Sequence, residues 1–310
     1  MPKISASWAR HTERQAMTKA LVLTDVTPRD GLQDATGFVP LEDKVALVTG
    51  LASAGFRHIE VTSFVNPDRI PMLCDADFLA PRVAHLSQDL VALAPNIKGV
   101  QRAIAAGIPA VMLVASASES HSQANLNHSR TEMLTILAEA ASYAHAHGLR
   151  VHGAISTAFE CPFEGTVPIA QVVELAEAYR AMGVATLNIA DTLGTATPNS
   201  VKARIRALRD VADASMPLGL HLHDRHGWAL ANVAMAYEWD VRHFESALGG
   251  LGGCPYAPGA AGNIDTEQLV RFFEAQGVPT GIDLDKLTAL RHQLLAVIDK
   301  NLPVAKEDAR

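Results

Sequence analysis

Short apolar runs rich in β-branched residues alternate with longer stretches whose apolar residues recur at helical spacing, almost from one end of the chain to the other. The short runs predict eight strands, at 21–27, 58–63, 90–94, 109–115, 150–156, 185–190, 218–223 and 242–247. The longer stretches predict helices, at 41–54, 74–86, 98–106, 129–147, 168–182, 198–213, 227–238 and 264–276. Such regular alternation predicts a parallel sheet with a helix after each strand.

Glycines and a proline mark the same boundaries. Gly55, Gly107, Gly148 and Gly183 each stand shortly before a predicted strand, where a helix commonly ends on a left-handed residue. Pro198 stands at a predicted first turn, a position that favours proline. These residues therefore support the strand and helix order independently of the apolar pattern.

Eight strand–helix units match a closed TIM (β/α)8 barrel, which typically needs about 250 residues. The alternative is an open doubly wound sheet, but no GxGxxG motif follows the first predicted strand. Because no linker-like segment divides residues 21–310, we expect one catalytic domain with a C-terminal helix near 283–300. Residues 1–20 are expected to form a loosely ordered leader. In such a barrel, reactive groups lie at the C-terminal ends of strands.

Composition narrows the class of protein. The chain has 310 residues, of which 48% are hydrophobic and 19% charged, and its longest apolar runs are shorter than the roughly 20 residues of a membrane span. A net charge of −7 without a basic stripe argues against a nucleic-acid partner. Three scattered cysteines indicate a reducing compartment, and the first residues lack a secretory signal, so we expect a cytoplasmic protein.

The segment Leu218-Gly-Leu-His-Leu-His-Asp224 carries the strongest chemical pattern. On a strand, His221 and His223 point to one face and the leucines between them to the other. A single histidine there is more often a hydrogen-bonded core residue. Two on one face at the C-terminal end of a strand favour a metal site, because imidazole is the commonest metal ligand.

A carboxylate ligand is available after the first predicted strand. Strands one and seven lie two apart in a ring of eight, so Asp30 can reach the two histidines. Alone, Arg29-Asp30-Gly31 is more typical of a turn with a surface ion pair. Asn263 is either the N-cap of the next helix or a fourth ligand.

Two further carboxylates stand at strand ends. Because burying an unpaired carboxylate is costly, Glu60 and Asp191 should each pair with Arg29 or face the metal or substrate, and we favour Glu60 as the partner of Arg29. The glycine-rich segment Gly249–Asn263 resembles a mobile lid, and its Cys254 could enter a closed site as a proton donor or acceptor. The remaining histidines of interest are expected mostly on the surface: His121, His128, His145, His147, His152 and His226.

Several segments between Leu21 and Leu284 resemble 3-hydroxy-3-methylglutaryl-CoA lyases, members of the metal-dependent barrel superfamily that includes isopropylmalate and homocitrate synthases. The matching segments are Pro28–Gln33, Ile59–Val65, Ala124–Asn127, Cys161–Gly165, Asp191–Gly194, His221–Asp224 and Gly252–Tyr256. The last of these is specific to the lyases, whereas the Arg-Asp-Gly and His-x-His motifs also occur in the synthases.

The resemblance implies a retro-Claisen cleavage of an acyl-CoA by a homodimer that binds Mg²⁺ or Mn²⁺. The implied metal ligands are Asp30, His221, His223 and Asn263. Asp30 or His221 would act as the base, Arg29 would stabilise the enolate of acetyl-CoA, and Cys254 would protonate it. The implied substrate-binding residues are Arg29, Gln33, Asn125, Asn188 and Ala154.

The sequence departs from the family pattern around the expected acyl pocket. Ala154 replaces a tyrosine, Asn188 replaces a small hydroxyl residue, and Arg225-His-Gly-Trp228 replaces Thr-Tyr-Gly-Gln. Loss of the tyrosine predicts room for a larger substituent at C3 of the substrate, unless Trp228 points inward and fills it. His226 lies within the same altered segment.

Three other functions share parts of this pattern. A condensing synthase is the closest alternative, but such enzymes usually lack the Gly-Gly-Cys-Pro-Tyr motif. A non-catalytic acyl-CoA-binding or metal-binding barrel is disfavoured because Arg29 and Cys254 are both present. Fe(II) oxygenases use two histidines and a carboxylate as well, usually on another fold.

Overall fold

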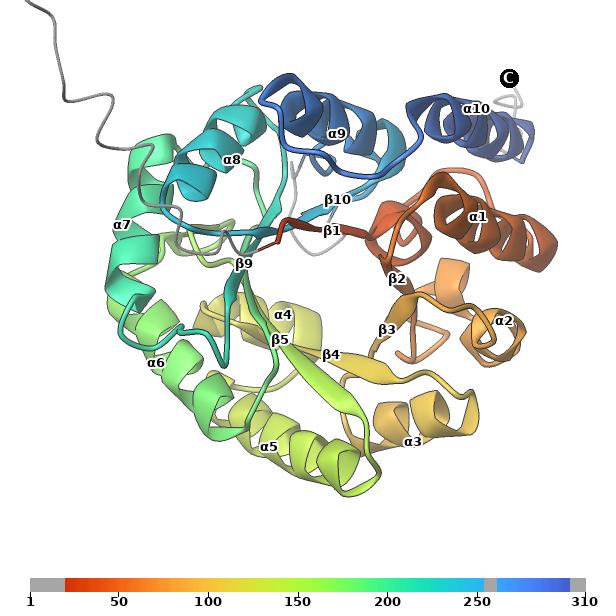
Figure 1. The fold of residues 1–310 in the computed structure, drawn as a ribbon. Coiled ribbons are helices and arrows are strands. Elements are labelled where there is room, and N and C mark those ends of the chain that lie inside the picture. Colours follow the sequence, from red (N-terminus) through yellow and green to blue (C-terminus); the bar gives the residue numbers. More distant parts are fainter. Residues whose placement is uncertain (1–19, 254–260, 302–310) are drawn as a thin grey trace, which may run out of the picture.

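The computed structural model describes residues 20–253 and 261–301, and in these ranges eight parallel strands close into a barrel surrounded by helices (Figure 1). Around the ring the order is β1, β10, β9, β8, β5, β4, β3 and β2. The strands are β1 (Val22–Asp25), β2 (His58–Ser63), β3 (Asp89–Leu93), β4 (Ala110–Ser116), β5 (Arg150–Ser156), β8 (Leu187–Asp191), β9 (Leu218–Leu222) and β10 (His243–Ser246). The predicted TIM barrel is confirmed.

An outer ring of helices covers the barrel (Figure 1). These helices are α1 (Leu41–Ala54), α2 (Ala76–Val83), α3 (Ile97–Ala105), α5 (Arg130–Ala146), α6 (Ile169–Ala181), α7 (Pro198–Leu208), α8 (Ala229–Glu238) and α9 (Thr266–Ala275). The predicted C-terminal helix is α10 (Leu284–Lys300), which packs outside the ring against α1. Gly50 of α1 admits the side chain of Leu290, since a Cβ at Gly50 would lie 2.6 Å from Leu290 Cδ1. None of the described helices combines the length and apolar character needed to cross a membrane.

Local signals explain where several helices begin and end. Ser129 and Glu132 form a reciprocal capping box at the start of α5, and Thr197 and Ser200 form one at the start of α7. Gly55 ends α1 at a φ of 107°, which a residue with a Cβ rarely adopts. The other three predicted glycines also have positive φ, between 72° and 77°.

Several short elements were not predicted. They are the π-helical turn η1 (Thr27–Gly31), the 3₁₀ turns η2 (Pro71–Leu73) and η3 (Leu248–Gly250), the helix α4 (Glu119–Leu126), and the hairpin of β6 (Glu160–Cys161) and β7 (Gly165–Thr166). The buried residues of α4 are His121 and Ser122, so this helix has no apolar stripe that a sequence pattern could detect. The predicted leader falls almost entirely outside the described residues.

The interior of the barrel differs from one side to the other. Strands β3, β4 and β5 supply a small apolar cluster that is separate from the main core between strands and helices: Val91, Ala110, Met112, Val114 and Ala154. Strands β8, β9 and β10 instead place Asn188, His221 and Glu245 in the interior, all buried. The side formed by β8, β9 and β10 therefore carries titratable and hydrogen-bonding groups, whereas the side formed by β3, β4 and β5 provides an apolar surface.

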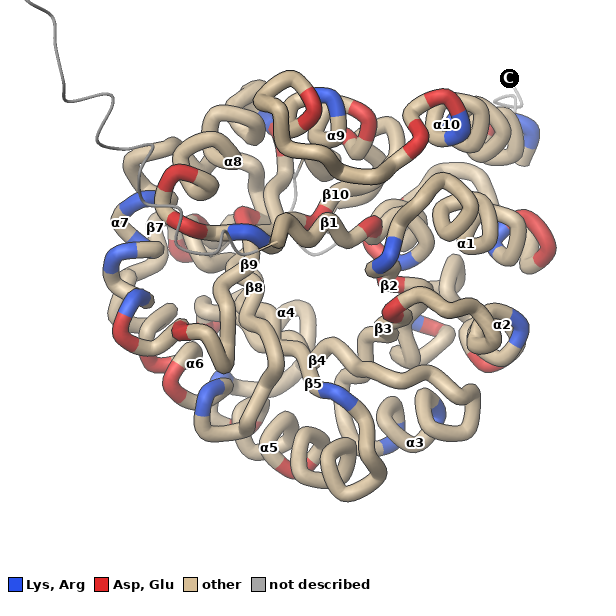
Figure 2. Tube along the Cα trace, in the orientation of Figure 1, with Lys and Arg blue, Asp and Glu red and all other residues tan. Residues whose placement is uncertain are grey.

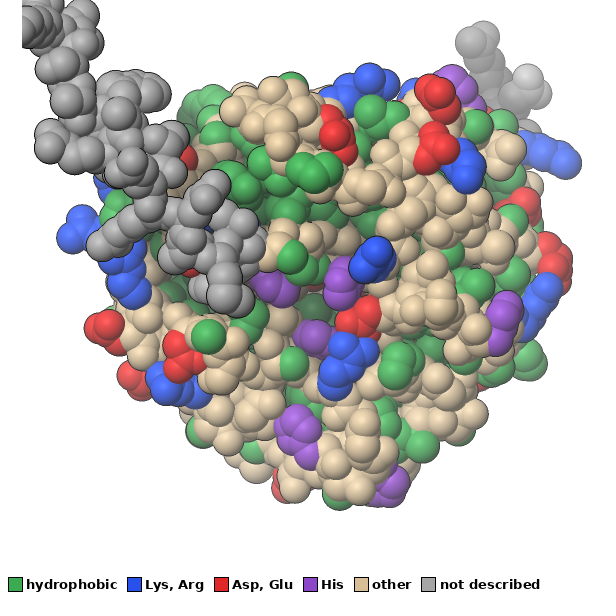
Figure 3. All heavy atoms as spheres, in the orientation of Figure 1, with side chains coloured by type: hydrophobic (Ala, Val, Ile, Leu, Met, Phe, Trp, Pro, Cys, Tyr) green, Lys and Arg blue, Asp and Glu red, His purple; other side chains and the backbone are tan. Residues whose placement is uncertain are grey.

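The end of the barrel where the strands begin is closed by charged groups. Asp89, the first residue of β3, pairs with Arg150, the first residue of β5, and its Oδ2 lies 3.2 Å from His58 Nδ1. Figure 2 shows acidic and basic positions around the central ring of strands as well as on the outer helices. On the face seen in Figure 3, histidine, acidic and basic side chains gather around the centre of the barrel. The functional cavity lies at the opposite end, where the strands finish.

Candidate active site

Three predicted metal ligands come together at the C-terminal end of the barrel. Nε2 of His221 and Nε2 of His223 are 3.0 Å apart, and they lie 3.7 and 3.8 Å from Asp30 Oδ2. One possible ligand atom from each residue lies within 4.8 Å of the others. His221 is in β9, His223 follows it directly after Leu222, and Asp30 lies in η1 after β1. Strands two apart in the ring therefore bring their ends to one centre, as expected.

Hydrogen bonds on the far side of each imidazole fix which nitrogen faces the cluster. His221 Nδ1 lies 2.7 Å from Glu245 Oε2, and His223 Nδ1 lies 2.6 Å from the carbonyl oxygen of Ala261. When each Nδ1 donates a proton to its oxygen, both Nε2 atoms present lone pairs to one another and to Asp30. Such convergence of acceptors favours a cation between them.

Asn263 completes the cluster. Its Nδ2 donates to Asp30 Oδ2 at 2.7 Å and to the carbonyl of Leu251 at 2.9 Å, while its buried Oδ1 has no hydrogen-bond partner among the described residues. The N-cap of α9 is Asp265, so the capping interpretation of Asn263 is wrong. One carboxylate, two imidazoles and one unpaired amide oxygen fit a divalent cation such as Mg²⁺ or Mn²⁺.

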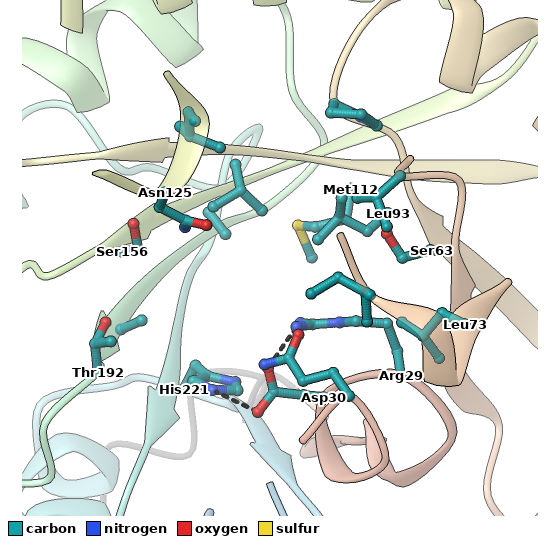
Figure 4. A pocket seen from close by; sticks show the side chains of 18 of the residues that line it. Arg29, Asp30, Ser63, Leu73, Leu93, Met112, Asn125, Ser156, Thr192 and His221 are labelled. Carbon is teal, nitrogen blue, oxygen red and sulfur yellow. Dashed lines mark hydrogen bonds and ion pairs between the residues drawn. The ribbon is translucent and has the colours of Figure 1, made fainter. Parts of the chain in front are cut away.

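Arg29 lies beside this cluster and is held by two carboxylates. Its Nε and Nη2 donate to Glu60 Oε2 at 2.8 and 2.6 Å, and its Nη1 pairs with Asp30. Figure 4 shows Asp30 between Arg29 and His221 on one side of the cavity. The predicted pairing of Glu60 with Arg29 is therefore present, and it fixes the guanidinium at the edge of the cavity.

The charges of the cluster follow from its contacts. Burial disfavours the ionised form of Asp30, but Arg29 and the two imidazoles outweigh it and lower the pKa of Asp30 to about 2. Burial and the neighbouring His221 lower the pKa of His223 to about 4. Burial opposes protonation of His221 too, yet the hydrogen bond to Glu245 and the charge of Asp30 raise its pKa. At neutral pH the cluster thus contains an anionic carboxylate and a neutral His223.

The cluster opens into a cavity of about 320 Å³. Opposite the charged side lie Leu93 and Met112, with Asn125 and Ser156 on a third side (Figure 4). Gln33 also lines the cavity, and its Nε2 donates to Asp30 Oδ1 at 3.0 Å and to the carbonyl of Gly253 at 2.7 Å. The predicted substrate-binding residues Gln33, Asn125 and Ala154 are thus all at the cavity.

Two predicted site residues lie elsewhere. Asp191 does not line the cavity, since its carboxylate oxygens accept from Thr195 N at 3.1 Å and Ala196 N at 2.9 Å, which holds the turn after β8. The expectation that it faces metal, substrate or Arg29 is wrong, and its burial raises its pKa to about 6. Asn188 is also absent from the cavity lining, because its side chain turns to Glu245.

The altered segment after His223 does not reach the cavity either. Arg225 and His226 are exposed, and Trp228 is 44% exposed, with its ring centroid 4.9 Å from that of His226 and the two rings tilted by 42°. Trp228 therefore leaves the space beside Ala154 unfilled. Cys254, the predicted proton donor, lies outside the described residues.

Sequence reasoning missed two residues at the site. Glu245 is in register with His221 across β10 and β9, and alternation along the predicted strand 242–247 could have placed it inward. His121 was expected on the surface, but it is fully buried, lines the cavity and has Nδ1 3.1 Å from Ser116 Oγ. His152 was also expected on the surface, but it lies half-buried inside the barrel.

The chain is similar in sequence and fold to known acyl-CoA lyases. Residues 20–294 match the family described as HMGL-like. The hydroxymethylglutaryl-CoA lyase YngG of Bacillus subtilis is 38% identical over 286 residues, covering 92% of this chain and 95% of YngG. The (R)-citramalyl-CoA lyase of Chloroflexus aurantiacus is 38% identical over 297 residues, covering 92% of this chain and 93% of that protein. The structure of an HMG-CoA lyase from Acinetobacter baumannii, in complex with coenzyme A and 3-methylmalate, superimposes with a TM-score of 0.87 at 39% identity, covering 95% of this chain and 96% of that one.

Proposed function

The chain belongs to the hydroxymethylglutaryl-CoA lyase family of carbon–carbon lyases, and from this premise we propose that it cleaves 3-hydroxy-3-methylglutaryl-CoA, or a closely related 3-hydroxy-3-substituted dicarboxylyl-CoA, to acetyl-CoA and a 3-keto acid. One observation carries the proposal: Asp30, His221, His223 and the unpaired Oδ1 of Asn263 converge next to Arg29 at the end of a cavity. For the methylglutaryl substrate the keto acid is acetoacetate.

The residues at the cavity can carry each step of a retro-Claisen cleavage. Asp30, His221, His223 and Asn263 would hold a divalent cation, which would supply Lewis acidity that lowers the pKa of the C3 hydroxyl. Asp30 lines the cavity and accepts the hydroxyl proton. The alternative base, His221, has its Nδ1 on Glu245 and its Nε2 directed at the cation, so it has no free nitrogen for this proton. The C3–O electrons then form a carbonyl while the C2–C3 bond breaks and its electron pair passes into the thioester enolate.

Arg29 stabilises the negative charge that develops on the enolate oxygen. Burial opposes its positive charge, but Glu60 and Asp30 raise the pKa of Arg29 further above its usual range, so it stays cationic. Because two carboxylates hold the guanidinium, little reorganisation is needed as charge develops. Cys254 then delivers a proton to the enolate carbon, which yields the methyl group of acetyl-CoA.

The cavity wall supports a substrate larger at C3 than the methyl compound. Leu93, Met112, Val114 and Ala154 line the side opposite Arg29, and the exposed Trp228 does not fill the space that Ala154 leaves. The relatives include lyases named for two different acyl-CoA substrates, so members of the family act on acyl groups of different structure. We therefore include longer apolar C3 substituents in the substrate class.

The decisive experiment incubates purified protein with Mn²⁺ and a panel of 3-hydroxy-3-alkylglutaryl-CoA compounds, and follows acetyl-CoA by mass spectrometry. Cleavage that EDTA abolishes supports the proposal, and longer alkyl groups should be cleaved at least as well as methyl. A strong preference for the methyl compound would contradict the enlarged pocket. Condensation of acetyl-CoA with a 2-oxo acid, without cleavage, would indicate a synthase instead.

The proton-donor role is tested by Cys254→Ala. We expect turnover to fall by about 10²-fold or more, in the range typical of a lost general acid, while bound metal measured by atomic emission stays at the wild-type level. Turnover that survives the substitution would show that Cys254 is not the proton donor.

On the family resemblance we also propose that the protein is cytoplasmic and forms a homodimer. Sedimentation analysis of the purified protein tests the oligomeric state.

A further inference from the structure

A chain of three buried side chains runs beneath the metal cluster. His221 Nδ1 donates to Glu245 Oε2 at 2.7 Å, and the other oxygen of Glu245, Oε1, accepts from Asn188 Nδ2. The exposed fractions of Asn188, Glu245 and His221 are 5%, 6% and 7%. Neither oxygen of the buried carboxylate is therefore left without a donor.

These residues come from three adjacent strands, with β9 in the middle. Glu245 on β10 is in register with His221 on β9, whereas Asn188 on β8 is in register with Gly219, two residues earlier on the same inward face of β9. To reach Glu245, the Asn188 side chain must cross β9 above Gly219. A Cβ at Gly219 would overlap Asn188 Oδ1, so the crossing depends on glycine at this position.

We propose that Asn188, Glu245 and Gly219 act together as positioning residues, which hold His221 with its Nδ1 protonated and its Nε2 directed at the cation. Asn188 fixes the orientation of the Glu245 carboxylate, Glu245 fixes the tautomer and ring orientation of His221, and Gly219 leaves the room that Asn188 needs. This inference rests on the metal site of the proposed function and not on the identity of the acyl substrate.

The physical reason lies in how a carboxylate orients an imidazole. A ligating histidine that donates its other N–H to a carboxylate has a fixed ring orientation and a more basic ligand nitrogen. A carboxylate held at only one oxygen can rotate, and its second oxygen would be buried without a donor. Asn188 supplies that donor, and its replacement should therefore weaken metal binding although it contacts no ligand atom of the cluster.

The test measures Mn²⁺ binding to the full chain without substrate, by titration calorimetry and by the electron paramagnetic resonance of free Mn²⁺. We expect Asn188→Leu, which removes the donor but keeps similar volume, to weaken binding about tenfold, and Glu245→Gln to weaken it by about 10- to 100-fold. Gly219→Ala should resemble Asn188→Leu, because it displaces Asn188 without removing any polar group. Asn188→Ser, a smaller change, serves if the leucine variant does not fold.

Gly153→Ala is the matched control for packing an extra methyl group against a strand. Its Cβ would lie 2.7 Å from the ring of Tyr179, outside the barrel interior, so it adds strain without touching the three positioning residues. We expect this variant to be less stable in thermal unfolding but to bind Mn²⁺ like the wild type. Weakened binding in Gly153→Ala equal to that in Gly219→Ala would overturn the proposal.

A second readout follows the histidine directly. In metal-free wild-type protein labelled with ¹⁵N at histidine, His221 should show a protonated Nδ1 with a hydrogen-bonded proton, and Asn188→Leu and Gly219→Ala should shift this signal. Wild-type Mn²⁺ affinity and an unshifted signal in both variants would exclude Asn188 from the positioning chain. Protein that binds Mn²⁺ but cleaves no acyl-CoA would contradict the proposed function alone and leave this result standing.

Discussion

Arg29 lines the cavity and is held in place by Glu60, which does not itself line the cavity. In Glu60→Gln the guanidinium keeps Asp30 but loses a charged partner, and we expect kcat/KM for acyl-CoA cleavage to fall by about 10²-fold, as for a misplaced catalytic group. Mn²⁺ affinity should change little, because the four ligands remain.

Glu42→Gln is the matched control for this substitution. Glu42 also pairs with an arginine, Arg82, but on the exposed surface of the outer ring. Because such surface pairs contribute little, this variant should keep wild-type kinetics. Equal losses in the two variants would show that Glu60 does not act through Arg29.

His152 predicts a specific acid sensitivity. Its Nδ1 lies 2.6 Å from Thr186 Oγ1, its Nε2 is buried without a partner in the described residues, and burial lowers its pKa to about 4. Between pH 6.5 and 4 the unfolded chain binds a proton at this position and the folded protein does not. The free energy of unfolding therefore decreases as the pH falls through this range.

In His152→Gln this contribution is absent. Urea denaturation of metal-free protein at pH 7 and pH 4.5 should show that the wild type loses about 2–3 kcal/mol more than the variant over this interval. Parallel losses in the two proteins would mean that His152 takes up its proton in the folded state as readily as in the unfolded one.

At the scale of elements, strands such as β8 and β9 could be predicted because they are buried on both faces and so appear as short apolar runs, whereas β1 and β5 alternate between buried and more exposed residues. The metal ligands could be predicted because alternation places His221 and His223 on one face. The helix α4 could not, since it buries His121 and Ser122 in place of an apolar stripe. The orientation of the Asn188 side chain toward Glu245 could not be predicted either. It depends on which strands flank β9 and on the absence of a side chain at Gly219.

The attachment of α10 depends on another close approach. A Cβ at Gly37 would overlap the carbonyl oxygen of Ile298 in the last full turns of α10, and this backbone atom cannot move without displacing the helix. We expect Gly37→Ala to lower the free energy of unfolding by about 1–3 kcal/mol, as measured by urea denaturation. Hydrogen exchange should become faster near Ile298. Unchanged exchange there would show that the strain is absorbed elsewhere.

At the scale of the whole molecule, the net charge of −7 says little about the proposed anionic acyl-CoA substrate, because Arg29 and the proposed cation would set the electric field inside the cavity. The cation should also stabilise the entire barrel, since its ligands exist together only in the folded state. At a free concentration one hundred times Kd, Mn²⁺ should add about 2.7 kcal/mol to the free energy of unfolding.

Thermal unfolding with and without Mn²⁺ measures this linkage. The wild type should unfold at a higher temperature when Mn²⁺ is present, and EDTA should reverse the shift. His223→Ala, which removes one ligand, should respond much less. An undiminished shift in this variant would place the stabilising ion at another position.

Asp30 and Asn263 are separated by 233 positions in the chain, yet Asn263 Nδ2 donates to Asp30 Oδ2. One follows the first strand of the barrel and the other follows the last. During synthesis, a ribosome has made nearly all of the barrel before the second of these residues emerges. A nascent chain or a fragment that ends before β10 lacks Asn263 and therefore cannot assemble the complete set of proposed ligands, so we expect full metal affinity only after the last strand of the barrel has been made.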